Sequence, residues 1–220
     1  MSIISTVYIP EGIAMAADSR LTGTTRYPDG RIESYTLSDN SQKIFLLKDK
    51  NIGISCCGDA TIGGKSVGDF IRQFEIDEIK QDDMVNDVAY KLKDYTLIKH
   101  GEGVIFHISG YIADTPYTYF INGGQIERRN VSTNGELTNG AFWNGQIDAL
   151  SKIFLGNPPM EINWDFMQLK DGIDLAEFMV DATIKYQRFS SGLPTCGGPI
   201  DILVITKDDS IWIKHKVIKP

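Results

Sequence analysis

The stretch Gly12-Ile13-Ala14-Met15-Ala16-Ala17-Asp18-Ser19-Arg20 decides how the fold of this chain is interpreted. It follows the turn residues Pro10-Glu11 directly, and a β-rich segment over residues 2–9 precedes that turn. Two short β-rich segments joined by a tight turn predict an antiparallel hairpin. Such a hairpin would return Asp18, which lies at the end of the apolar run, to the neighbourhood of Ser2.

Ser2 carries the main chemical signal of the sequence. An initiator Met that precedes a side chain as small as serine is normally removed, so we expect the mature chain to begin at Ser2. A terminal serine offers a hydroxyl nucleophile together with a free α-amine. An unperturbed α-amino group titrates at about 7.7–8.0, which suits a general base near neutral pH.

The composition is that of a single globular domain over residues 1–220, with 42% hydrophobic and 23% charged residues. The net charge of −7 and the absence of any Lys/Arg run argue against a nucleic-acid partner. We see neither a signal peptide nor an apolar run of membrane-spanning length. The three cysteines favour reduced thiols in the cytoplasm, and without CxxC or HExxH we expect no metal site and no cofactor.

Hydrophobic periodicity predicts blocks of strands separated by pairs of helices. Strands are expected over residues 2–9, 13–17, 43–47, 51–57, 104–112, 117–121, 125–131, 200–206 and 211–217. Helices are expected after residue 58, through Val67 and Phe74, and over residues 82–98, 146–155 and 175–189. This order favours an α+β fold, drawn as a four-layer α/β/β/α sandwich of two antiparallel sheets between helix pairs.

The segment Ala16-Ala17-Asp18-Ser19-Arg20, at its distance from Ser2, resembles the corresponding segment of proteasome β-type subunits. These are N-terminal nucleophile (Ntn) hydrolases. The resemblance covers nearly the whole chain and suggests a divergent bacterial proteasome-like protein. The family's catalytic lysine would be Lys43, in Gln42-Lys43-Ile44. Its glycine before the first helix would be Gly58, in Cys57-Gly58-Asp59.

The resemblance implies a role for each of these residues. Ser2 would attack a carbonyl while its own amine takes the proton. Lys43, held as a cation by Asp18, would favour the neutral form of that amine by like-charge repulsion. The backbone N–H of Gly58, at a helix start, would stabilise the oxyanion.

Two positions depart from the family pattern. Asn144 occupies the place of a serine that lies near the nucleophile, and its amide can still form hydrogen bonds. In Leu193-Pro194-Thr195-Cys196-Gly197-Gly198, Leu193 replaces an Asp and Cys196 replaces a Ser. Asn144 and Cys196 are therefore expected only as supporting residues.

The resemblance also places a substrate pocket. Its lining would include small or apolar side chains, which hint at an apolar substrate group, although Phe45 and Cys56 fit a core role equally well. The expected lining residues are Leu21, Thr22, Phe45, Cys56, Ala60 and Gly64.

We therefore expect an Ntn-type peptidase that cleaves peptide or other amide bonds through an acyl-enzyme on Ser2. The alternatives are a catalytically silent structural subunit, which the missing Asp favours, and a small-molecule amidase with the same chemistry. The family implies self-association, as in a ring, whereas the sequence identifies neither an unfoldase partner nor a substrate.

Overall fold

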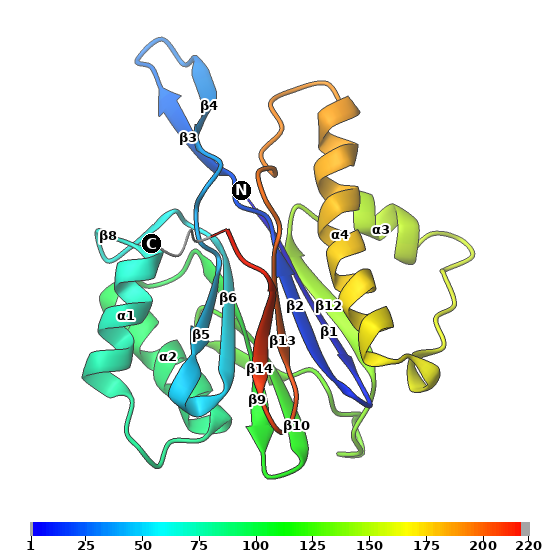
Figure 1. Cartoon of the computed structure of the whole chain (residues 1–220). Coiled ribbons are helices and arrows are strands. Elements are labelled where there is room, and N and C mark those ends of the chain that lie inside the picture. The colour runs from blue at the N-terminus through cyan, green and yellow to red at the C-terminus, as the bar shows by residue number, and fades with distance from the viewer. Residues whose placement is uncertain (1, 217–220) are drawn as a thin grey trace.

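The computed structural model describes residues 2–216 (Figure 1). The strands are β1 (Ile3–Ile9), β2 (Gly12–Ala17), β3 (Leu21–Arg26), β4 (Ile32–Ser38), β5 (Ile44–Leu47), β6 (Ile52–Gly58), β7 (Thr61–Ile62), β8 (Lys65–Ser66), β9 (Val104–Ile112), β10 (Thr115–Asn122), β11 (Gln125–Arg128), β12 (Gly140–Gly145), β13 (Asp201–Ile205) and β14 (Ser210–Lys214). The α-helices are α1 (Val67–Glu78), α2 (Val85–Lys99), α3 (Asp148–Phe154) and α4 (Leu169–Phe189).

Two five-stranded sheets form the body of the molecule. One has the strand order β12-β1-β2-β13-β14, and the other has the order β11-β10-β9-β6-β5. Every strand pair within them is antiparallel. The predicted hairpin is confirmed as β1–β2, and its register pairs Ile4 with Ala17, which brings Asp18 beside the start of β1.

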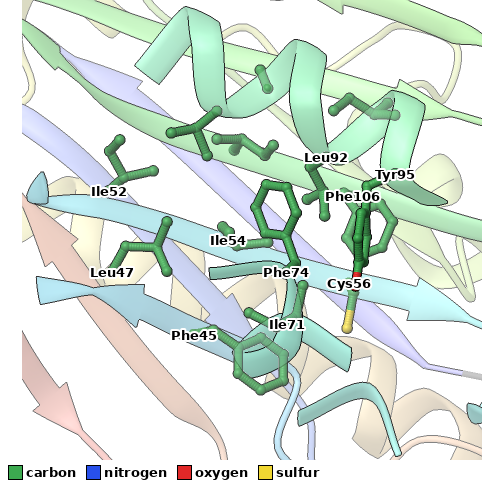
Figure 2. Packing of buried hydrophobic residues seen from close by; sticks show 14 of the residues in the cluster. Phe45, Leu47, Ile52, Ile54, Cys56, Ile71, Phe74, Leu92, Tyr95 and Phe106 are labelled. Carbon is green, nitrogen blue, oxygen red and sulfur yellow. The ribbon is translucent and has the colours of Figure 1, made fainter. Parts of the chain in front are cut away.

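Three apolar clusters hold these elements together. Figure 2 shows the first, in which Phe74 of α1 and Leu92 of α2 meet Phe106 of β9. A second cluster joins α3 and α4 to the sheet that contains β1. The third is made by side chains of both sheets, such as Met15 and Cys57. Burying each large apolar side chain stabilises the fold by about 1.5–3 kcal/mol.

The expected four-layer α/β/β/α sandwich with two helix pairs is corrected by the structure. Residues 2–216 form a mixed α/β fold with antiparallel sheets and four α-helices. Helices α3 and α4 differ in length and in packing. Helix α4 runs along β1 and β2, whereas the seven-residue α3 packs chiefly on α4. Two further two-stranded sheets, β3–β4 and β7–β8, are separate from the large ones.

Local sequence explains the main differences from the predicted elements. The segment after Gly58 forms the β7–β8 hairpin, so α1 begins only at Val67, where Ser66 accepts from the Asp69 N–H as N-cap. Helix α4 begins six residues before the predicted 175, where Asp171 Oδ2 accepts from the Gln168 N–H and caps the first turn. Its Gly172 packs closely on β1. A Cβ on Gly172 would lie 2.8 Å from Ile9 Cδ1. Strand β12 was not predicted, and residue 217 of the last predicted strand lies outside the described residues.

The polar residues 22–41 form a hairpin that stands away from the body. Strands β3 and β4 pair only with each other, and in Figure 1 they project beyond the ends of both large sheets. Ile32, Tyr35 and Leu37 are exposed on it. Among residues 2–216, no helix has the length and apolar character needed to cross a membrane.

A buried polar chain crosses between the two large sheets. His107 of β9 is fully buried, its Nδ1 lies 2.9 Å from Thr6 Oγ1, and its Nε2 lies 2.9 Å from Asn144 Oδ1. Burial lowers the pKa of His107 from 6.5 to about 3, so the ring is neutral at physiological pH. Because an amide oxygen only accepts, Nε2 donates to Asn144, and Nδ1 accepts from the Thr6 hydroxyl.

This histidine makes stability depend on pH. Between about pH 6.5 and 3 the unfolded chain binds a proton at His107 that the folded chain excludes, so stability falls as the pH drops through this window. We expect His107→Gln, whose amide can donate and accept but does not titrate, to reduce that slope by up to about 1.4 kcal/mol per pH unit. Urea unfolding of both proteins between pH 4 and 7 measures the slope, and equal slopes would contradict this assignment.

Candidate active site

Asp18 is the most buried charged residue of the candidate site. It follows β2 directly and is fully buried. Its Oδ1 accepts from the Ile3 N–H at 3.0 Å, and its Oδ2 accepts from the N–H groups of Arg20 at 3.1 Å and Gly197 at 3.0 Å. Three backbone donors from three segments fix the carboxylate, and its charge remains to be balanced by a cation.

Lys43 supplies that cation. Its Nζ donates to Asp18 Oδ1 at 2.6 Å and to the carbonyl oxygen of Arg20 at 2.7 Å, and the residue is only 5% exposed. The backbone is fixed as well, because the Lys43 carbonyl accepts from the Cys56 N–H at 2.9 Å. A buried charge is stable only when paired and hydrogen-bonded, and each member of this pair meets that condition for the other.

Ser2 directly precedes β1 and is 8% exposed. Its carbonyl oxygen accepts from the Gln146 N–H at 2.8 Å. Gly145 has φ +106°, and a Cβ there would lie 1.9 Å from the Ser2 oxygen, so glycine is required at that position. The N–H of the next residue, Ile3, donates to Asp18. Both polar groups of the Ser2–Ile3 peptide bond are therefore hydrogen-bonded.

Ser2, Lys43 and Gly58 line one cavity of about 380 Å³. Asp18 lies behind Lys43, outside the cavity lining. Leu21, Thr22, Cys56 and Ala60, which were expected in a substrate pocket, are part of the lining, together with several hydroxyl-bearing side chains. The lining comprises Ser2, Arg20, Leu21, Thr22, Thr24, Ser34, Ser41, Gln42, Lys43, Cys56, Cys57, Gly58, Asp59, Ala60, Val67 and Thr195.

The backbone at Gly58 differs from the expected helix start. Gly58 is the last residue of β6, with φ +115°, and a Cβ there would lie 2.1 Å from the Gly103 oxygen. The following N–H, of Asp59, donates to that same oxygen at 3.0 Å. Any oxyanion stabilisation by Gly58 would therefore come from a strand end shaped by glycine, without the dipole of α1.

Other expected site residues lie elsewhere. Phe45 belongs to the apolar cluster under α1, and Gly64 lies in the β7–β8 turn; neither lines the cavity. Asn144 forms its hydrogen bond with His107. Cys196 is buried in the cluster beneath α4, although its chain neighbours Thr195 and Gly197 reach the site.

The cysteines do not offer a nucleophile. Burial raises the thiol pKa of Cys56, Cys57 and Cys196 to about 12 in each case. All three are free thiols, and at neutral pH they stay protonated and unreactive. The hydroxyl of Ser2 lines the same cavity as Lys43.

Several structural residues of the site were not predicted. Arg20 forms a bidentate pair with Asp39 at 2.7 and 3.0 Å and donates to the Pro194 carbonyl at 3.1 Å, tying the root of the β3–β4 hairpin to the segment before Gly197. The pair of glycines at 197–198 was visible in sequence, but the donation from Gly197 to Asp18 was not. Gln187, whose amide binds the segments on both sides of the site, gave no sequence signal.

The comparisons with known proteins give a likeness of fold. No protein-family model matches the chain, and no curated protein matches it. A similar solved structure is that of a Gly-1 mutant of Anbu from Hyphomicrobium sp. strain MC1. It has a TM-score of 0.65 and 16% identity, over 98% of this chain and 86% of that one. The chain is similar to Anbu in fold.

This result corrects the family assignment. Membership of the proteasome β-type, Ntn-hydrolase family was expected from Ser2, the Asp18 segment, Lys43 and Gly58. With no family model matching and only 16% identity to Anbu, the comparisons support a shared fold and no family membership. The short motifs were too few to carry a family assignment across 220 residues.

Removing the cation tests the buried pair. Lys43→Met would leave the Asp18 carboxylate buried without its counter-charge, and we expect a loss of about 3–5 kcal/mol in the free energy of unfolding. The matched control Lys48→Met changes an exposed lysine and should shift stability by less than about 0.5 kcal/mol. Denaturant unfolding at pH 7 measures both, and equal shifts would show that the pair contributes little.

Proposed function

We propose that this chain hydrolyses an amide bond, in a peptide or another acyl amide, with Ser2 as the nucleophile after Met1 is removed. The observation that carries the proposal is the shared cavity, onto which Ser2, Lys43 and Gly58 open while Asp18 fixes Lys43 from behind. Met1 itself lies outside the described residues, so its removal is part of the proposal.

The first half-reaction forms an ester. Ser2 Oγ attacks the carbonyl carbon, and its proton passes to the α-amine of the same residue. The Gly58 N–H would receive the oxyanion of the tetrahedral intermediate. The C–N bond then breaks, the leaving amine takes the proton from the α-ammonium group, and the acyl group remains on Ser2.

The second half-reaction restores the enzyme. The α-amine takes a proton from water as the water attacks the ester carbonyl. The second tetrahedral intermediate expels Ser2 Oγ, which regains its proton, and a carboxylic acid leaves. Throughout, the positive charge of Lys43 favours the neutral, basic form of the amine and stabilises negative charge that develops at Oγ.

Three further parts of the proposal concern the substrate, the cellular location and self-association. The hydroxyl-bearing side chains in the cavity lining, such as Thr22 and Ser41, support a substrate with hydrogen-bonding groups next to the cleaved bond. The three free thiols support the cytoplasmic location expected from the sequence. Self-association stays a prediction, to be measured by solution mass.

A covalent probe tests the nucleophile. We expect the purified protein to have lost Met1 and to gain one β-lactone adduct that maps to Ser2. Ser2→Ala keeps a small second residue, so trimming should continue while labelling falls at least about 100-fold. The control Ser190→Ala removes an exposed hydroxyl at the end of α4 and should label normally.

Each contrary result has a definite meaning. Retention of Met1, or a trimmed protein that takes no adduct, would overturn the proposal in favour of a catalytically silent structural protein. If labelling succeeds, cleavage of peptides or of small acyl amides by the same preparation would decide between a peptidase and a small-molecule amidase.

A further inference from the structure

One side chain outside the cavity lining connects the segments that hold Ser2 and Asp18 in place. Gln187 lies in the last turns of α4 and is half-buried. Its Oε1 accepts from the N–H groups of Thr195 and Cys196, both at 2.8 Å. Two strong bonds on one oxygen fix two consecutive peptide units of a segment that has no regular secondary structure.

The nitrogen of the same amide binds a second segment. Gln187 Nε2 donates to Gln146 Oε1 at 3.0 Å and to Thr195 Oγ1 at 3.3 Å. The backbone N–H of Gln146 in turn donates to the carbonyl oxygen of Ser2 at 2.8 Å. The residue that holds the Ser2 backbone is therefore itself held by Gln187.

The segment bound by Oε1 leads to the other half of the site. Gly197 follows Cys196 directly and donates its N–H to Asp18 Oδ2 at 3.0 Å, while its carbonyl accepts from the Ser19 N–H at 2.9 Å. Asp18 holds Lys43. Gln187 therefore connects two segments: one binds the Ser2 backbone, and the other binds Asp18, which holds Lys43.

We propose that Gln187 is a positioning residue that holds Ser2 and the Asp18–Lys43 pair in their reactive arrangement. This inference rests on the proposed function of Ser2. An amide suits the task because its oxygen accepts twice and its nitrogen donates twice, and all four bonds are made here. Neither a carboxylate nor an apolar side chain can supply both halves.

The test measures how fast Ser2 is acylated by a β-lactone probe, followed by intact mass. For Gln187→Ala we expect the maximal labelling rate to fall about 10–100-fold, because a displacement of about 1 Å at reacting groups has that effect. The probe concentration for half-maximal rate should change little, since Gln187 does not line the cavity.

The variant Gln187→Glu gives a signature that loss of stability alone would not. In its ionised form the new carboxylate accepts from both backbone N–H groups but repels Gln146 Oε1, and in its protonated form it regains a donor. We therefore expect the ratio of variant to wild-type labelling rates to rise as the pH falls through the ionisation of the new carboxyl, near about 4.3. A ratio independent of pH would overturn the inference.

The control is Gln73→Ala, which removes an exposed glutamine amide on α1 that binds Asp77 Oδ1 at 2.6 Å. It should be labelled at the wild-type rate. If wild type is labelled on Ser2 and Gln187→Ala is labelled equally fast, the role of Gln187 is overturned while the proposed function stands. If wild type takes no label, the proposed function fails, and this inference fails with it.

Discussion

The arrangement of the site depends on the buried contact between Asp18 and Lys43. Neither charge could be removed from water alone, so the fold surrounds the carboxylate with three backbone donors and places the ammonium at 2.6 Å. Those donors come from the start of β1, the residues after β2 and the segment before β13. A single carboxylate thus determines how three distant parts of the chain meet.

The part of the structure near this contact could be predicted well from sequence. The apolar run that ends at Asp18 and the turn before it determine the β1–β2 hairpin locally, so a short pattern was enough. Lys43 could be matched only through a resemblance, because a lone lysine before an apolar strand has the same sequence pattern as an exposed one. The structure buries it, which no local pattern requires.

The rest could not be predicted, because it depends on contacts between residues far apart in the chain. Gln187 binds Thr195 and Gln146 through a side-chain amide, and amides at helix ends are ordinarily solvated. The interpretation of Gly58 as a helix start was wrong, because the glycine is required by the nearby Gly103 carbonyl and not by a following helix. Phe45 satisfied an apolar pattern that fits a pocket and a core equally well, and packing decided for the core.

The placement of Ser2 has a consequence for the order of events during synthesis. Strand β1 lies between β2 and β12, and the Ser2 carbonyl is held by Gln146, from the second half of the chain. The backbone contact that fixes Ser2 can therefore form only after residue 146 has been synthesised and β12 has paired with β1. The surroundings of Ser2 would thus be completed late, when the two halves of the chain fold together.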